Sequence, residues 1–269
     1  MSGYDTVEEE TRAQRKKLRG KGVKAHLQYY WDYYRWPVLI AAAAVIFAVS
    51  ILHGILTQKQ TAFSVVLINS GTYSGDTYNA LREKLGRELA IDPSSEEVYV
   101  DLNATLSVGS FSSQFDMATL EKLAAQQSSG DIDCMIADAV NFEYYTKAGS
   151  FVLLSDVLDE EQIDALRDRI YYVDGEEIAK WQELTSRSDY ELPVPTREEI
   201  EKKEGREGYC APDPADMEQP EAVGILLDES PLLNQYGLYA KTIPVLGFCQ
   251  AARHPEQAAE FLRIALQNP

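Results

Sequence analysis

The feature that most constrains this chain is an uninterrupted apolar run, WPVLIAAAAVIFAVSILHGIL, from Trp36 to Leu56. Its 21 residues include no Asp, Glu, Lys or Arg, and about 20 such residues suffice for an α-helix to cross the hydrocarbon of a bilayer. The residues just before and at its start are rich in aromatic side chains, which favour the membrane interface: Tyr29, Tyr30, Trp31, Tyr33, Tyr34 and Trp36. We therefore predict a transmembrane helix over residues 36–57.

The charges on the two sides of this run predict its orientation. Residues 1–57 hold 8 of the 25 Lys and Arg and 5 of the 43 Asp and Glu, a net charge of +3. The rest of the chain keeps 17 basic against 38 acidic residues, a net charge of −21. Because basic segments stay on the cytoplasmic side, we expect residues 1–35 to form a cytoplasmic tail. The rest would lie outside the cell membrane. A cleaved signal peptide is the alternative, although its apolar core is usually shorter and its basic segment is not this long.

The first half of the outer part, which we place at residues 62–269, alternates between strand and helix patterns. Compact or alternating apolar runs predict strands, and leucines spaced by three and four predict helices. The predicted strands cover 63–68, 96–106 and 132–137, and the predicted helices cover 78–89 and 113–129, the latter with Met117, Leu120 and Ala124 on its buried face. This order is typical of an α/β domain with a mostly parallel sheet and flanking helices.

The second half is less regular. We predict a short helix over 159–169, a hairpin over 170–179 that turns at Asp174-Gly175, strands over 222–228 and 242–251, and a closing helix that starts at Pro255. Residues 180–221 hold 5 of the 11 prolines and 12 Asp or Glu against 6 Lys or Arg. Such a composition predicts an acidic, loop-dominated insertion.

Two segments resemble extracellular solute-binding proteins. SSGDIDCMIADAVNFEYYTKAGSFVLLSDVL, residues 128–158, is similar to a strand that leads into an aromatic helix in that family, and ARHPEQAAEFLRIAL resembles its C-terminal helix. The resemblance covers some 46 residues and implies the periplasmic-binding-protein fold. Only about 70 residues, 152–221, separate the first segment from the returning strand, so a full second lobe does not fit. The resemblance therefore implies one lobe of that fold.

Polar and aromatic side chains follow the first and third predicted strands. In open α/β sheets, ligands bind beyond the carboxyl ends of the strands, and such side chains suit sugars or peptides. The candidate ligand-binding residues are Asn69, Ser70, Thr72, Tyr73, Asp138, Asn141, Phe142 and Tyr145. On this reading, Asp138→Ala and Phe142→Ala abolish binding and leave the fold cooperative. The alternative is that Asp138 or Asn141 caps the next helix and that Phe142 and Tyr145 pack its base.

Other chemistry has little support in the sequence. There is no HExxH zinc motif, GxSxG elbow, P-loop or dinucleotide fingerprint, so we predict no cofactor and no enzyme activity. The charge of −21 argues against nucleic acid as a partner. The three cysteines, Cys134, Cys210 and Cys249, cannot all pair within one chain. We expect Cys134 and Cys249 to be buried thiols, with a bridge between them open if their strands are neighbours.

Two classes of function remain. The first is non-catalytic binding or sensing of a small solute, a sugar or a peptide, at the cell surface. The second is a structural or assembly role, in which the outer domain contacts a protein partner, for example through residues 180–221. A concave aromatic cleft at 69–73 and 138–145 would favour the first class, and a filled sheet edge would favour the second.

Overall fold

The computed structural model describes residues 23–106, 114–186 and 209–267. The chain divides into two compact units, Met1–Gln58 and Lys59–Pro269. The predicted basic tail therefore lies mostly outside the described residues.

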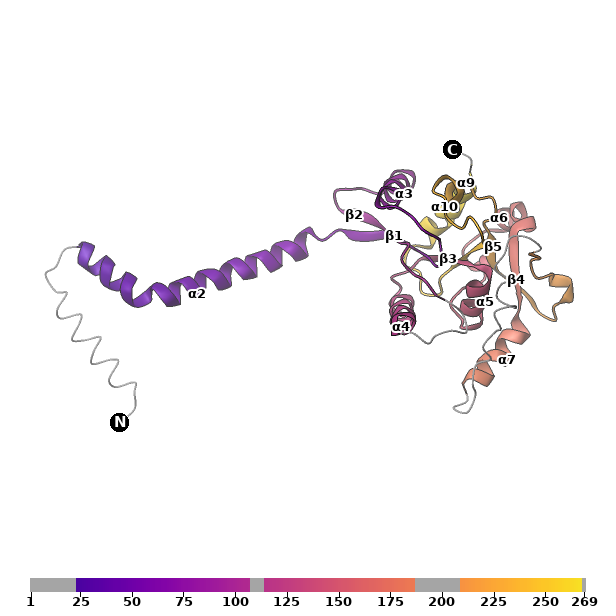
Figure 1. Ribbon diagram of the computed structural model, residues 1–269, viewed down its shortest axis with the longest axis horizontal. Coiled ribbons are helices and arrows are strands. Elements are labelled where there is room, and N and C mark those ends of the chain that lie inside the picture. The colour runs from indigo at the N-terminus through magenta and orange to yellow at the C-terminus, as the bar shows by residue number, and fades with distance from the viewer. Residues whose placement is uncertain (1–22, 107–113, 187–208, 268–269) are drawn as a thin grey trace. The chain divides into compact units, whose positions relative to one another are not determined.

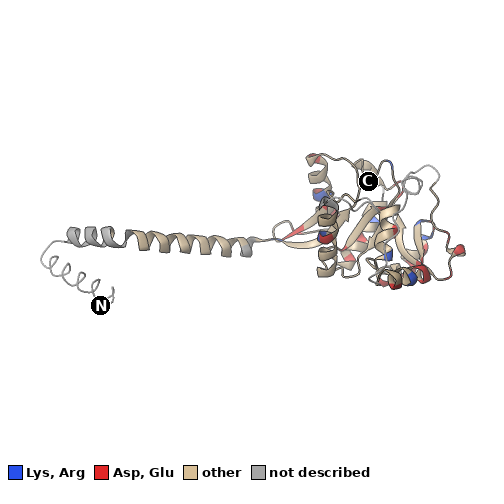
Figure 2. Cartoon of the chain, turned by 60° about the horizontal axis from the view of Figure 1, so that its bottom comes forward, with Lys and Arg blue, Asp and Glu red and all other residues tan. Residues whose placement is uncertain are grey.

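The first unit is built on one helix, α2 (Val23–Thr57), which begins well before the predicted segment. Its stretch Trp36–Gly54 is, within the described part of the chain, the one helix long and apolar enough to cross a membrane. Figure 2 draws this stretch wholly in tan, without Lys, Arg, Asp or Glu. Large apolar side chains are exposed on every side of it, and a helix that is apolar all round is typical of a membrane span: Val38, Leu39, Ile40, Val45, Ile46, Phe47, Val49, Ile51 and Leu52. By length and composition the helix fits either a membrane span or a signal sequence.

The second unit is a six-stranded mixed sheet in the order β2-β1-β3-β6-β5-β4. Its strands are β1 (Gln60–Leu67), β2 (Glu96–Asp101), β3 (Cys134–Asp138), β4 (Ile170–Asp174), β5 (Pro220–Leu226) and β6 (Pro244–Phe248) (Figure 1). β1 pairs in parallel with β2 and β3, whereas the β3–β6, β6–β5 and β5–β4 pairs are antiparallel. Four strands thus run in one direction, and β4 and β6 run in the other. The α/β prediction is confirmed, with the parallel pairing confined to β1–β3.

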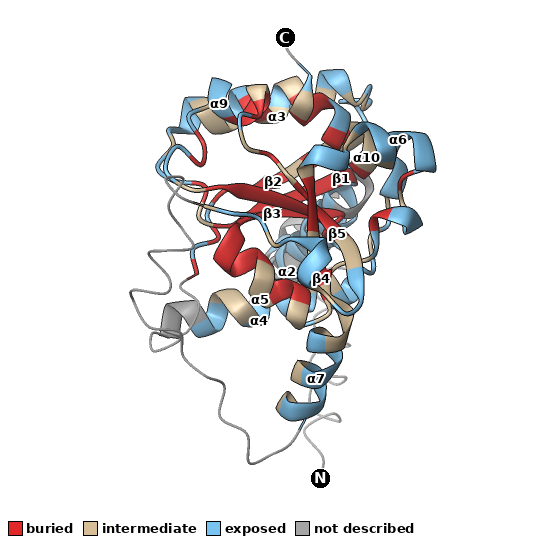
Figure 3. Ribbon diagram, turned by 90° about the vertical axis from the view of Figure 1, so that its right-hand side faces the viewer, coloured by how far each residue is buried: buried red, intermediate tan, exposed pale blue. Residues whose placement is uncertain are grey.

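Helices cover both faces of the sheet, which explains the continuous apolar runs in its strands. Alternate residues of β1 point into two separate cores: Phe63, Val65 and Leu67 into one, and Val66 into the other. The first core is closed by α3 (Gly75–Glu88), α9 (Pro231–Gln235) and α10 (Pro255–Leu266), and the second by α4 (Gln114–Ser129) and α5 (Ala139–Lys147). Figure 3 shows the strands and much of α5 as buried, and α7 (Gly175–Thr185) and α6 (Glu160–Ala165) as largely exposed.

Local capping fixes where most helices begin. Ser74, Asp138 and Ser230 each accept a hydrogen bond from a backbone N–H in the first turn of α3, α5 and α9, as N-cap side chains do. At α6 the Asp159 side chain and Gln162 form a reciprocal capping box. α10 starts with Pro255 at its first turn, as predicted.

The predicted hairpin over 170–179 is wrong. β4 ends at Asp174, whose side chain accepts a hydrogen bond from the Glu176 N–H at 3.0 Å and caps α7. Asp-Gly serves a turn and a helix start equally well, and the helix-forming residues that follow decide for the helix. The strand that pairs with β4 is β5, with Asp174 opposite Pro220.

Three further predictions are corrected. The strand expected over 96–106 ends at Asp101. In α4 the buried side chain is Leu123, whereas Ala124 is exposed and Met117 is 48% exposed. The predicted insertion 180–221 is described at its ends only, where α7 extends to Thr185 and β5 begins at Pro220, with a short 3-10 turn, Pro214–Asp216, between Tyr209 and β5. Its centre, 187–208, lies outside the described residues.

Cys134 and Cys249 are buried and free, as expected, and Cys210 is exposed. Cys134 lies opposite Phe248 in the β3–β6 pair, so Cys249, one residue further on, points to the other face of the sheet. The two thiols accordingly belong to different cores. The bridge between them, open on the sequence, does not form.

Candidate functional site

The two predicted loops do meet at one edge of the sheet. The side-chain amide Nδ2 of Asn69, just after β1, donates to Oδ2 of Asp138 at 2.8 Å, across 69 positions of the chain. The same amide donates to the carbonyl of Leu106 at 2.7 Å, and its Oδ1 accepts from the Leu106 N–H at 3.0 Å. Asn69 thereby ties β1, β3 and the segment after β2 together.

Asp138 and Asn141 are used inside the fold. Oδ1 of Asp138 accepts from the Asn141 N–H at 3.1 Å and caps α5, while its Oδ2 accepts from Nδ2 of Asn141 at 2.8 Å. Both side chains are only 1% exposed. Their hydrogen-bonding groups therefore point to each other and to Asn69, and not to a free surface.

Phe142 and Tyr145 pack the second core. Phe142 is fully buried, stacks on Phe151 with ring centroids 4.5 Å apart, and meets the edge of Tyr171 at 5.1 Å. Tyr145 is 5% exposed, and burial raises the pKa of its hydroxyl. The capping and packing role, the alternative reading of these residues, is the one that the geometry shows.

Ser70, Thr72 and Tyr73 differ in exposure. Ser70 is buried, and its carbonyl accepts from the Tyr239 N–H at 2.9 Å. Thr72 is exposed, and Tyr73 is half-buried with its hydroxyl donating to Oδ1 of Asn103 at 2.6 Å. Of the eight predicted site residues, Asn69, Thr72 and Tyr73 thus keep surface that a ligand at this edge can reach, and the side-chain amide of Asn69 is already hydrogen-bonded within the fold.

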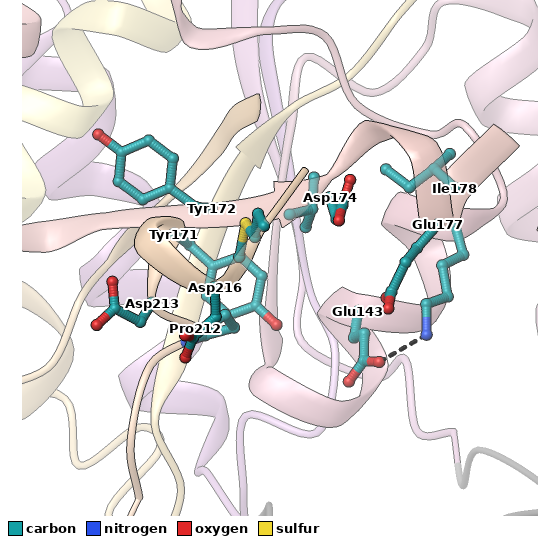
Figure 4. Close-up of a pocket in the computed structure, with 12 residues that line it drawn as sticks. Glu143, Tyr171, Tyr172, Asp174, Glu177, Ile178, Pro212, Asp213 and Asp216 are labelled. Atoms are coloured by element: carbon teal, nitrogen blue, oxygen red, sulfur yellow. Dashed lines mark hydrogen bonds and ion pairs between the residues drawn. The ribbon is translucent and has the colours of Figure 1, made fainter. Parts of the chain in front are cut away.

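A cleft of about 310 Å³ lies elsewhere, beside the edge strand β4. Its walls come from α5, β4, the start of α7 and the segment 212–217 (Figure 4). These parts are far apart in the sequence and are joined by Asp174. Its carboxylate accepts from the backbone N–H groups of Glu176, Glu218 and Gln219 at 3.0–3.2 Å. The hydrogen bond from Glu218, followed by the others, holds the pKa of Asp174 below its usual value.

The cleft is acidic. It is lined by five carboxylates and one ammonium group: Glu143, Asp174, Glu177, Asp213, Asp216 and Lys147. The ammonium group is committed, because Nζ of Lys147 pairs with Oε1 of Glu143 at 2.7 Å (Figure 4). The remaining lining is largely apolar or aromatic, with Tyr172, Ile178 and Met217 among it.

Tyr171 contributes a phenol hydroxyl to this lining. Its side chain is only 3% exposed, and burial, followed by the nearby Tyr209 and Glu143, raises its pKa well above the usual range. In Figure 4 the ring points from β4 toward Glu143, and no hydrogen bond joins its hydroxyl to another residue drawn. Within the described part of the chain this hydroxyl has no hydrogen-bond partner, and it opens onto the cleft.

Sequence patterns do not reveal this cleft. Glu143 and Lys147 lie in the segment 128–158, which resembles solute-binding proteins, but Tyr171, Asp174 and Glu177 lie where the sequence predicts a hairpin. The feature of the sequence that points to the cleft is the acidic composition of residues 180–221, which include the lining residues Pro212–Met217.

A second hollow, of about 470 Å³, lies between α3 and β2. It is the larger of the two, but its charges balance, with Lys59, Arg82 and Arg87 against Glu83, Glu96 and Glu97. Arg82 and Glu97 already pair with each other at 2.9 Å. We therefore regard the acidic cleft at β4 as the candidate site.

Comparisons with known proteins place the chain in no established family. No family model matches it. No curated protein matches it either. Among solved structures, it is similar to iron-bound HitA from Pseudomonas aeruginosa, with 9% identity and a TM-score of 0.33 over 77% of this chain and 81% of that chain. A likeness of this degree transfers no ligand to the present chain.

Proposed function

We propose that this chain is a single-pass membrane protein whose acidic α/β unit binds a ligand on the extracytoplasmic side without transforming it. The observation that carries the proposal is the cleft beside β4, a concave site on a folded unit with the Tyr171 hydroxyl in its lining. Pockets of this size, with a few polar groups in an apolar lining, are typical binding sites.

The membrane anchor and its orientation rest on α2 and its flanks. The helix has the length and composition of a span. The basic residues that precede it favour a cytoplasmic N-terminus: Arg12, Arg15, Lys16, Lys17, Arg19, Lys21 and Lys24. The acidic unit would then face the outside.

Orientation can be tested with the native cysteines. Cys210 is exposed, whereas Cys134 and Cys249 are buried. A membrane-impermeant maleimide added to intact cells should label the full chain at Cys210, and the Cys210→Ser variant should stay unlabelled. Labelling that requires lysis would contradict the orientation, and a mature protein that lacks residues 36–57 by mass would show a cleaved signal peptide instead of an anchor.

Binding can be tested by a thermal-shift screen of the full chain, in an uncharged detergent, against sugars, amino acids, peptides and amines. A ligand present at about 100 times its dissociation constant stabilises the folded state by about 2.7 kcal/mol, which raises the melting midpoint by several degrees. The ligand binds in the cleft if its shift of the melting midpoint is smaller in Glu177→Gln and unchanged in Thr72→Ala. The reverse pattern places the ligand at the 69–73 edge. A cooperatively melting protein that no compound shifts would contradict ligand binding.

An assembly role is the second candidate, and one observation favours it. The sheet edge at Asn69 and Asp138 is filled by its own side chains, as expected of a unit that contacts a protein through its surface and holds no solute at that edge. Affinity purification of the full chain and of a variant without residues 187–208 would separate the two. A partner that is lost with this segment supports assembly.

A further inference from the structure

We propose that the cleft beside β4 binds an organic cation, an alkylammonium or guanidinium group carried on a short aliphatic stem. This inference rests on the proposed binding function and adds the chemical class of the ligand.

The charge of the cleft is not neutralised from within. Lys147 is paired with Glu143, and the carboxylate of Asp174 is occupied by three backbone N–H groups. Glu177 and Asp216 line the cleft, are exposed, and take part in no ion pair within the described part of the chain. The fifth carboxylate, Asp213, accepts from the Ala215 N–H at 2.9 Å. Two carboxylates, one on α7 and one in the segment 212–217, thus remain for a cation.

The Tyr171 hydroxyl gives the cation a directional contact. The hydroxyl lies in the lining of the cleft and has no hydrogen-bond partner within the described residues, so a ligand can bond to it without displacing one of the protein's own contacts. An ammonium or guanidinium group has only N–H donors to offer, and the oxygen of Tyr171 can accept one.

The lining selects an organic cation over a metal ion. In the described ranges no group of three or more His, Cys, Asp or Glu side chains is placed to hold a metal. Tyr172, Ile178 and Met217 instead give the cleft apolar walls, which can cover methylene groups. A volume of about 310 Å³ admits a stem of several heavy atoms, the size of a lysine or arginine side chain or of a small diamine.

The test uses isothermal titration calorimetry of the full chain in an uncharged detergent, with two amine probes and their matched neutral controls. The free amine is 1,5-diaminopentane, and its control is 1,5-pentanediol, which has the same number of heavy atoms and no charge. The peptide probe is acetyl-Gly-Lys-Gly-amide, and its control carries norleucine in place of lysine. We expect at least one amine to bind, neither control to bind, and affinity to fall with added salt because the attraction is partly between exposed charges.

Three variants locate the site. Tyr171→Phe removes only the hydroxyl and should weaken the amine about tenfold, the value of one hydrogen bond to a charged group. Glu177→Gln with Asp216→Asn should weaken it about fivefold, since exposed pairs contribute less. Glu160→Gln with Glu161→Gln removes the same charge from the exposed first turn of α6 and should leave affinity unchanged.

The outcomes identify the source of the cation and decide whether the inference holds. Binding of the diamine alone indicates a free amine, and binding of the peptide alone indicates a basic segment of a partner protein. Equal binding of the diamine and the diol, or of the parent and Tyr171→Phe, overturns the inference. If neither amine binds while an uncharged compound shifts the melting midpoint in the screen above, the cation inference fails and the proposed binding function stands.

Discussion

The backbone N–H of His254 donates a 2.8 Å hydrogen bond to Oδ1 of Asp133, which joins two residues 121 positions apart. The same carboxylate accepts from Nδ1 of His254 at 3.1 Å, from the Arg253 N–H at 3.0 Å and from the Ser64 N–H at 2.8 Å. Asp133 is 1% exposed. One buried carboxylate, just before β3, therefore fastens β1 and the start of α10 to that part of the chain.

Asp133→Ala should lower the free energy of unfolding by about 3–5 kcal/mol, because it leaves several backbone N–H groups without an acceptor away from water. Asp131→Ala, two residues away, is the control, since that side chain is 48% exposed and pairs only at the surface with Arg253 and Ser129. Asp131→Ala should lower the free energy of unfolding by about 1 kcal/mol or less. Urea unfolding followed by circular dichroism measures both, and equal losses would show that Asp133 is no special anchor.

Acid should weaken the contact between Asp101 and Lys122. Burial of the Asp101 carboxylate would raise its pKa, but Nζ of Lys122 at 2.5 Å and the Asn103 N–H at 2.9 Å outweigh burial and hold the pKa below the usual 3.8. A lowered pKa in the folded state means that this stabilisation is complete above pH 3.8 and is lost as the pH falls through the lower, folded value.

Lys122→Gln should therefore destabilise the protein by about 1 kcal/mol at neutral pH, a modest figure because Lys122 is half exposed. The difference from the parent should shrink below pH 3.8. Urea midpoints measured from neutral to acid pH test this. The control is Lys241→Gln at an exposed position, whose difference in stability from the parent should not change with pH. A difference that persists unchanged in acid would contradict the assignment.

Asp138→Ala should destabilise the fold by about 2 kcal/mol, through the loss of the α5 cap and of the side-chain bonds from Asn69 and Asn141. This replaces the expectation that the variant leaves the fold intact and removes only binding. Thr72→Ala, on the exposed part of the same edge, should be neutral within about 0.5 kcal/mol. Thermal melting of the two variants compares them, and an unchanged melting midpoint for Asp138→Ala would restore Asp138 as a binding residue.

Gly247→Ala should destabilise by about 1–3 kcal/mol, the usual result of overfilling a packed core. A Cβ there would lie 2.5 Å from Cδ1 of Phe151 and 2.8 Å from Cε2 of Phe142. Phe151→Leu in the same chain should recover part of the loss, so the double variant should be less unstable than the sum of the singles. Gly86→Ala is the matched control, because nothing lies within 4 Å of its Cβ and alanine favours the helix that holds it. Additive losses at Gly247 and Phe151 would argue against the clash.

Thiol reagents should modify one cysteine, Cys210, in the folded protein. Burial raises the pKa of Cys249 to about 12 and that of Cys134 well above its usual value, whereas Cys210 is exposed. Mass spectrometry after native labelling should show one adduct, none in Cys210→Ser, and three in urea. An oxidised protein with a Cys134–Cys249 bridge would contradict their placement on opposite faces of the sheet.

The sequence was most informative where structure is local. The apolar run 63–68 and the leucine spacing of 78–89 predict β1 and α3 because burial on both faces of a strand, or one face of a helix, leaves a periodic pattern. The rule that parallel strands end at one edge also predicts that Asn69 and Asp138 meet. It does not predict that Leu106 covers them, because that contact depends on a segment 37 residues from Asn69.

The acidic cleft shows the limit of local patterns. Tyr171 and Glu143 become neighbours only because β4 lies at the far edge of the sheet, beyond β5 and β6, which follow it in the sequence. Asp174-Gly175 is compatible with a turn and with a helix cap, and the choice depends on where the partner strand lies. Neither fact is encoded within a short window.

The position of β6 has a consequence for biosynthesis. Among the described strands it is the last to be made, yet it lies inside the sheet between β3 and β5 and hydrogen-bonds to both. While a ribosome is still adding residues 244–248, the first three strands and the β4–β5 pair have no strand to connect them. The unit must therefore wait for this segment before its sheet can close, and a nascent chain halted ahead of it would expose two unfinished sheet edges to chaperones and proteases.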